Sequence, residues 1–151
     1  MPWAKGTVVK ESKGFVFLAG TEGTKPESSD TAMYEKEGDV FVKQAIAEGA
    51  EVQTRIALEK IKTSLEEMGS SLDNIVKMTC YVVGDPGFPN GVANSPTWVK
   101  AQKAMNEFFQ EHCPDLCWDK NPPCMDLIGV AGLAVKEMLI EIAAIAVLSD
   151  T

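Results

Sequence analysis

The stretch MLIEIAAIAVL, residues 138–148, constrains the fold more than any other part of the chain. It carries a single charge, Glu141, and it is shorter than the ~20 apolar residues that a membrane-spanning helix needs. Its isoleucine and valine content predicts a strand inside a sheet, apolar on both faces. An ionised carboxylate in such a setting costs on the order of several kcal/mol unless a partner compensates it. Glu141 therefore either reaches solvent or has a chemical role.

Strand and helix patterns alternate along the rest of the chain, whose 151 residues fit a single domain, 1–151. Strands are predicted at residues 7–9, 15–19, 75–83, 127–134 and 139–148, and helices at residues 46–68 and from Pro96 onward. Gly69 is expected to end the first helix, and Ser95 has the residue type of an N-cap before Pro96. Residues 21–39, rich in Gly, Pro, Ser and charge, are predicted to form a loop.

This order predicts an α+β fold with one mixed β-sheet and both helices packed on one face. The last two strands are expected to form an antiparallel pair. The inward face of the first helix is predicted to carry Val52, Ile56, Ile61, Leu65 and Met68. Hydrophobic residues make up 45% of the chain, so the uncovered face of the sheet is expected to bind a second copy of the chain.

The charge distribution restricts the partners. The net charge is −8 and no basic run occurs, which argues against nucleic acid and anionic membranes. The first 14 residues lack the apolar core of a signal peptide, so we expect a cytoplasmic protein whose four cysteines are reduced.

The segment HCPDLCWDKNPPC groups the only histidine with three of the four cysteines. A zinc site built from His112, Cys113, Cys117 and Cys124 is one interpretation, but the segment has no CxxC pair and matches no common zinc spacing. We therefore expect no metal, and thiols that pack as small apolar groups. Cys117 or Cys124 as a nucleophile would need His112 as base, whereas a histidine at a helix C-terminus is explained by the helix dipole.

Residues 53–83, QTRIALEKIKTSLEEMGSSLDNIVKMTCYVV, resemble the signature helix and strand of the RidA (YjgF/YER057c/UK114) family. FVFLAGTEG, PWAKG, GVAGL and EIAAIAV resemble other segments of that family, in the same order. The resemblance implies a chorismate-mutase-like α+β fold, assembled as a homotrimer with a barrel-like centre and with ligand clefts between subunits. It also implies hydrolysis of reactive enamines or imines with release of ammonia, without metal or organic cofactor.

The resemblance assigns site residues position by position. Glu141 matches the family's catalytic glutamate, and Thr21 lies in Ala19-Gly20-Thr21, which replaces Ser-Gly-Gln. Counted back without gaps from Leu133, the family's arginine becomes Met125. The other matched positions are Trp3, for a tyrosine, and Gln102, for an asparagine.

The replacement of arginine by Met125 bears on the substrate. A guanidinium holds a carboxylate through two parallel hydrogen bonds, and a thioether cannot. Simple 2-imino acids are therefore not expected, whereas a larger conjugated enamine, such as an aminomuconate-like catabolic intermediate, is. Asp126 and Lys120 are candidates for polar contacts, although both residue types are commonly just solvated. Trp3 and Trp118 could stack on a planar substrate or simply anchor the chain to the core.

The interpretation of Glu141 keeps three alternatives. In a partly dry cleft its pKa would be raised, which suits proton transfer to an enamine and from water. A carboxylate that merely points to solvent is the simplest alternative. A trimer that binds small molecules, or acts like a chaperone, without catalysis is the second. A ribonuclease is the third, and the acidic chain makes it the least expected.

Overall fold

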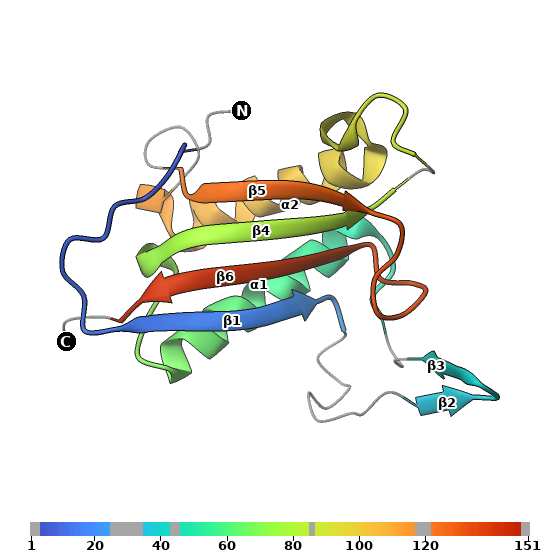
Figure 1. The fold of residues 1–151 in the computed structure, drawn as a ribbon, viewed down its shortest axis with the longest axis horizontal. Helices are drawn as coiled ribbons and strands as arrows, with labels where there is room; N and C mark the ends of the chain where they lie inside the picture. Colours follow the sequence, from blue (N-terminus) through green and yellow to red (C-terminus); the bar gives the residue numbers. More distant parts are fainter. Residues whose placement is uncertain (1–3, 25–34, 43–45, 85–86, 117–121, 149–151) are drawn as a thin grey trace.

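The computed structural model describes residues 4–24, 35–42, 46–84, 87–116 and 122–148. Its centre is a four-stranded sheet with the strand order β1-β6-β4-β5. The strands are β1 (Phe15–Glu22), β4 (Ile75–Val83), β5 (Cys124–Val130) and β6 (Ile140–Val147). The helices α1 (Ala50–Glu67) and α2 (Pro96–His112) lie side by side on one face of this sheet, and none of the described elements covers the other face (Figure 1). The predicted α+β class, with both helices on one face, is confirmed.

The predicted antiparallel pair of the last two strands is wrong. β6 lies between β1 and β4 and runs antiparallel to both, whereas β5 is parallel to β4 at the edge of the sheet (Figure 1). Parallel neighbours need a long crossover, and α2 supplies it between β4 and β5. The short connection between β5 and β6 suggested a hairpin, but the chain instead crosses β4 to reach the middle of the sheet.

The N-terminal strand predicted at residues 7–9 is also absent. This segment contains no strand and leaves Val8 83% exposed, while Thr7 Oγ1 donates a hydrogen bond to the Val76 carbonyl at 2.8 Å. Three residues with strand propensity therefore do not join the sheet, so propensity alone did not decide their structure.

A short hairpin begins inside the segment predicted as a loop, residues 21–39, and extends beyond its end. It pairs β2 (Glu35–Glu37) with β3 (Val40–Val42), and it lies apart from the main sheet (Figure 1). Gly38 in its turn has a φ of +64°, a conformation that glycine adopts without strain. The residues of β2 and those on both sides of Gly38 are charged, so the sequence showed no apolar alternation typical of a strand.

Helix α1 starts four residues later than predicted, because Gly49, with a φ of +88°, precedes its first residue. Its end agrees with the prediction, since Gly69 has a φ of +84° and Ser70 N donates to the Leu65 carbonyl. The buried face of α1 also differs in part from the predicted one. Val52 and Met68 are 48% and 54% exposed, and the inward positions include Gln53, Thr54, Ala57 and Leu58.

Helix α2 begins as the sequence predicts. Ser95 is the N-cap, its Oγ accepts a hydrogen bond from Trp98 N at 3.2 Å, and Pro96 occupies the first helical position. The buried face of the helix carries Trp98, Ala101, Ala104, Met105, Phe108 and Phe109. None of the described helices is long and apolar enough to cross a membrane.

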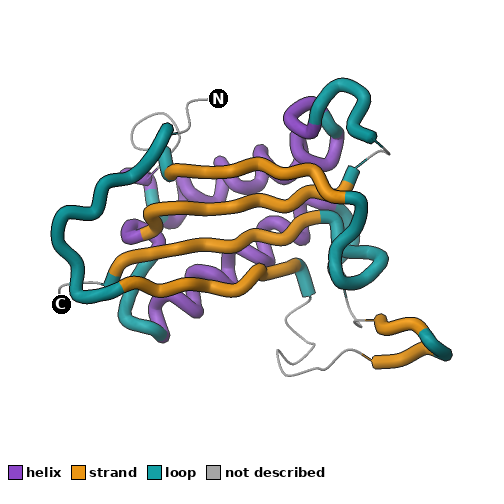
Figure 2. The backbone as a smooth tube through the Cα atoms, in the orientation of Figure 1, coloured by secondary structure: helices purple, strands orange, loops and turns teal. Residues whose placement is uncertain are grey.

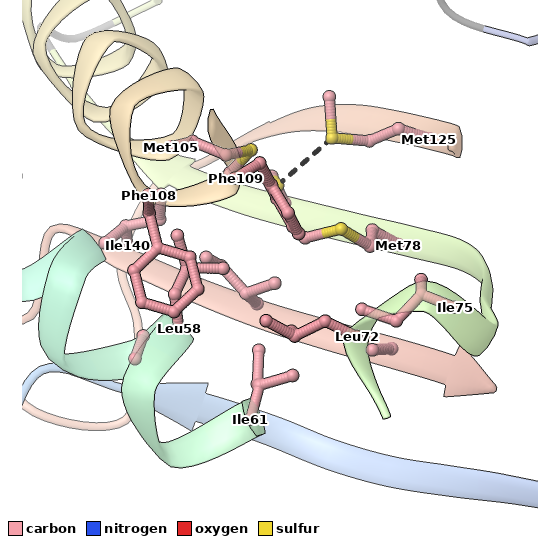
Figure 3. Close-up of a cluster of buried hydrophobic side chains, with 14 of the residues drawn as sticks. Leu58, Ile61, Leu72, Ile75, Met78, Met105, Phe108, Phe109, Met125 and Ile140 are labelled. Atoms are coloured by element: carbon pink, nitrogen blue, oxygen red, sulfur yellow. Dashed lines mark hydrogen bonds between the residues drawn. The ribbon is translucent and has the colours of Figure 1, made fainter. Parts of the chain in front are cut away.

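The hydrophobic core lies between the helices and the sheet. Leu58 and Ile61 of α1 and Phe108 and Phe109 of α2 meet side chains such as Ile140 from the sheet (Figure 3). On β6 every second residue is buried in this core, and these residues are Ile140, Ile142, Ala144 and Ala146. The intervening residues, Glu141 among them, are half-buried and lie on the face that the helices leave open. Figure 2 shows the strands of the main sheet side by side on this face.

Candidate functional site

Glu141 lies near the start of β6, on the open face of the sheet. In the register of the sheet it is directly opposite Tyr81 of β4 on one side and Glu22 of β1 on the other. Tyr81 is in turn paired with Ile128 of β5. Directly opposed residues of an antiparallel pair point to the same face. The row Glu22, Glu141, Tyr81 and Ile128 therefore crosses the whole sheet.

A bulge in β1 makes room for the carboxyl of Glu141. Between Leu18 and Thr21 the register shifts, so that two residues of β1, Ala19 and Gly20, oppose one residue of β6. A Cβ atom placed on Gly20 would lie 2.8 Å from Glu141 Cγ and closer still to its carboxyl group. The side chain of Glu141 thus lies directly over the backbone of Gly20, where only glycine leaves enough space.

The surroundings of Glu141 favour its neutral form. Burial, and after it the negative charge of Glu22, raises the pKa of the Glu141 carboxyl above its ordinary value. Within the described part of the chain, no hydrogen bond or ion pair to this carboxyl compensates its charge. A carboxyl with a raised pKa keeps its proton to higher pH than an ordinary carboxyl, which suits it to give up a proton and take one back during a reaction.

Among the residues that the structure describes, the carboxylate of Glu22, unlike that of Glu141, has an ion pair and a hydrogen bond that stabilise its charge. It lies 3.5 Å from Lys60 Nζ of α1 and accepts a hydrogen bond from Thr24 Oγ1. Glu22 and Lys60 also border a cavity of about 580 Å³ between the end of β1 and α1. The lining residues are Gly20, Thr21, Glu22, Arg55, Ile56, Glu59, Lys60, Thr63, Ser64 and Glu67. A cavity lined mainly by polar and charged residue types therefore adjoins the strand segment that carries Gly20 and Glu22.

The structure brings only some of the predicted site residues together. Thr21 lines the cavity, and its Oγ1 donates to the Ala19 carbonyl at 3.2 Å. Gln102 lies in the middle of α2, in the helix layer, and is therefore on the other side of the sheet from Glu141. Trp3, Trp118 and Lys120 lie outside the described residues.

The placement of Met125 corrects its assignment as a site residue. Its side chain is 6% exposed and points into the core, where Cys80 Sγ lies 3.5 Å from Met125 Sδ (Figure 3). Because neighbouring residues of a strand point to opposite faces, Asp126 is the residue that shares the open face with Glu141. The ungapped count was thus one residue away from the open face.

Asp126 forms an ion pair with Lys77, whose Nζ lies 2.8 Å from Asp126 Oδ2. The hydrogen bond to Asp126, and then the negative charge of Asp126, raises the pKa of Lys77. Both side chains are exposed on the open face. Lys77 of β4 therefore supplies a positive charge to this part of the open face, whereas Lys120, the loop lysine that the sequence suggested, lies outside the described residues.

Sequence reasoning missed Glu22, Lys77 and Tyr81. Alternation in IVKMTCYVV does place Lys77 and Tyr81 on one face of β4, so part of the signal was available. The missing information was the strand order, because only the adjacency of β6 with β1 and β4 brings these residues to Glu141.

The thiols do not form a metal site in the described residues, where no three His, Cys, Asp or Glu side chains are grouped around a common point. Cys113 is buried and its Sγ donates to Asp73 Oδ1 at 2.8 Å. Burial raises the pKa of Cys80 to about 12, so that its thiol stays neutral and unreactive. Cys124 is half-buried, and Cys117 lies outside the described residues.

Comparison with known proteins now identifies the family. The model of the family described as Endoribonuclease L-PSP matches residues 2–148. The chain belongs to this family. A RutC family protein of Pyrococcus abyssi is 30% identical over 132 residues, which cover 87% of this chain and 77% of that protein.

Two solved structures from E. coli share the fold. TdcF with bound serine superposes with a TM-score of 0.61 at 24% identity, over 99% of this chain and 90% of TdcF. The YjgF gene product superposes with a TM-score of 0.60 at 22% identity, over 97% of this chain and 87% of that chain. These two likenesses establish the fold alone, whereas the family model and the relative from Pyrococcus abyssi confirm the resemblance to the RidA (YjgF) family.

Proposed function

We propose that this protein is a hydrolytic deaminase, which converts an enamine or imine to a carbonyl compound and ammonia with Glu141 as the proton carrier. The observation that supports this most is the position of Glu141, half-buried on the open face, with its carboxyl over Gly20 and its pKa raised by burial. Family membership is consistent with this chemistry. No metal or organic cofactor takes part in the proposed reaction.

The proposed reaction uses one carboxyl four times. Neutral Glu141 protonates the enamine carbon, which gives an iminium ion. The resulting carboxylate then takes a proton from water while the water oxygen bonds to the iminium carbon. Glu141 next protonates the nitrogen, the C–N bond breaks, ammonia leaves, and the hydroxyl proton returns to the carboxylate. The sum is enamine plus water to ketone plus ammonia, with Glu141 restored to its neutral form.

The polar groups of the open face limit which class of substrate it can bind. Asp126, paired with Lys77, is on this face, and Met125 is in the core. A bidentate clamp for a small carboxylate is therefore missing from this stretch of β5. We propose that the substrate is a larger conjugated enamine, bound through its apolar and planar parts against side chains such as Tyr81 and Ile128, and not a simple 2-imino acid.

The open face also supports a proposed homotrimer with sites between subunits. Phe15, Phe17 and Ile128 are exposed there, which is unusual for a face that remains in water. A neighbouring subunit would cover this face and close the cleft around Glu141. The described cysteines are free thiols, which fits the cytoplasm as the proposed location.

The family's name includes an endoribonuclease, but the charge of this chain does not favour RNA as a substrate. The net charge is −8, Asp126 lies on the open face, and Glu22 is the register partner of Glu141. Phosphate backbones are bound mainly through clustered lysine and arginine. A small molecule therefore fits this surface better than a polyanion does.

Ammonia release from a panel of enamines tests the proposal, with wild type compared with Glu141→Gln. The panel should contain conjugated amino-dienoates and simple 2-imino acids. We expect turnover of the former and a loss of roughly 10²-fold or more in Glu141→Gln, because the amide keeps the shape but carries no transferable proton. Ligand binding by both proteins with turnover by neither would instead support the non-catalytic binding trimer.

A further inference from the structure

Two carboxylates lie opposite each other at the end of the β1–β6 pair. Glu22 and Glu141 are register partners, and like charges in directly opposed positions destabilise a sheet. A sequence could remove this repulsion with one substitution at Glu22, which is the last residue of an edge strand. The pair therefore calls for a physical explanation.

The two carboxylates have unequal surroundings. Glu22 has Lys60 Nζ at 3.5 Å and the hydroxyl of Thr24 as a donor, and both contacts stabilise its ionised form. Its side chain is only 12% exposed, so solvent screens these contacts little. Glu141 faces Gly20 and Glu22 of β1 on one side and Tyr81 of β4 on the other, and α1 contributes Lys60 behind Glu22. No cation among the described residues forms an ion pair with Glu141.

We propose that Glu22 is a positioning residue of the site, a fixed carboxylate held by Lys60 and Thr24 that sets the protonation of Glu141 across the β1–β6 pair. When two titratable groups share a site, unequal surroundings assign one to remain charged and the other to carry the proton. Here Glu22 remains charged and Glu141 carries the proton. This inference rests on the proposed function for its chemical purpose, but not for its test.

The fixed charge has a second consequence for the proposed reaction. Protonation of an enamine carbon by Glu141 gives an iminium cation, and Glu22 is the register partner of Glu141. A preorganised negative charge stabilises a developing positive charge in a partly dry site. The class of intermediate that this pair favours is therefore a cation, which suits an iminium ion and disfavours an anionic tetrahedral intermediate such as that of ester hydrolysis.

The test is a titration of the Glu141 side chain by carbon-13 NMR, with its signal assigned by comparison with Glu141→Gln. In Glu22→Gln the shape is kept and the charge is lost, so we expect the Glu141 midpoint to move to lower pH. In Lys60→Met a cation is lost, so we expect the midpoint to move to higher pH. Two variants with opposite expected directions keep the test decisive even if one of them folds poorly.

Glu51→Gln is the matched control, because Glu51 is also a carboxylate of a lysine pair, 3.6 Å from Lys103 Nζ, but in the helix layer. It should leave the Glu141 midpoint unchanged. An unchanged midpoint in Glu22→Gln, or an equal change in Glu51→Gln, would overturn the inference about Glu22.

With an active substrate, the pH profile adds a second readout. The reaction needs neutral Glu141, so kcat/KM falls as the pH rises through its pKa, and this limb should move to lower pH in Glu22→Gln. A shifted NMR midpoint without turnover in any variant would retain the role of Glu22 and reject the deaminase. Turnover with an unshifted NMR midpoint and an unshifted limb of the pH profile would retain the deaminase and reject the role of Glu22.

Discussion

At the scale of single residues, Gly20 is the most informative position after the carboxylates. Its φ does not lie in the left-handed region, so alanine is compatible with the backbone, but its Cβ would occupy the place of the Glu141 carboxyl. We expect Gly20→Ala to displace this flexible side chain, to cost at most about 1–2 kcal/mol of stability, and to reduce kcat by roughly 10-fold or more. Ammonia release and thermal unfolding, measured on the same preparation, check this.

Gly132→Ala is the control for that substitution. A Cβ on Gly132 would meet nothing within 4 Å, and this glycine lies in the connection between β5 and β6. It should retain full activity. If Gly20→Ala also retained full activity with a normal melting temperature, the carboxyl of Glu141 would not need its place above the bulge, and the proposed geometry of the site would be wrong.

The sequence identified Glu141 because an isolated charge in an apolar strand is a strong local signal. It could not identify Glu22, because a glutamate that follows a strand is common and its meaning depends on the strand opposite it. The assignment of Met125 failed for a related reason. An error of one residue in a strand moves a side chain to the other face, and only the structure distinguished Met125 from Asp126.

At the scale of elements, Gln53 connects α1 to the strand that carries Glu141. Its Nε2 donates to the Ala47 carbonyl at 2.9 Å and to the Glu137 carbonyl at 3.0 Å, and its Oε1 accepts from Leu139 N at 2.8 Å. Gln53 is 1% exposed, its hydrogen bond to Ala47 is buried, and those to Glu137 and Leu139 are part-buried. They fix the backbone two residues before Glu141.

We expect Gln53→Met, which keeps the volume but removes all three hydrogen bonds, to lower the free energy of unfolding by roughly 2–5 kcal/mol, because buried polar groups lose their partners. Gln53→Glu keeps the acceptor for Leu139 N and should fall between wild type and Gln53→Met when the carboxyl is neutral. Urea unfolding at pH 5 and pH 8 measures both. A cost below 1 kcal/mol for Gln53→Met would mean that water replaces the side chain.

Most elements could be predicted from the sequence, but not their neighbours. The β4 strand and the start of α2 agree with the predictions because alternation and capping are local signals. The strand order β1-β6-β4-β5 depends on how α2 crosses the sheet and on which faces meet in the core. A local sequence pattern predicts neither of these. This is why the predicted antiparallel pair of β5 and β6 was wrong.

At the scale of the whole molecule, the two faces of the sheet differ in whether other elements cover them. The helix face is a closed core, whereas the open face exposes Phe15 and Phe17, whose ring centroids are 6.2 Å apart, and Ile128. Aromatic and branched apolar side chains on one continuous face are typical of the centre of a subunit interface. The proposed homotrimer would bury this face and bring the row of Glu141 against a neighbouring subunit.

We therefore expect Phe17→Asp to dissociate the assembly, because Phe17 is 72% exposed in the single chain and a carboxylate there would have to be desolvated on association. Val99→Asp is the matched control, since Val99 is 54% exposed on α2, in the helix layer. Sedimentation should give the mass of three chains for wild type and Val99→Asp, and a smaller mass for Phe17→Asp. Because the proposed cleft is shared, activity should fall with the same substitution and follow protein concentration. A monomeric wild type with full activity would show instead that Glu141 works on an open surface.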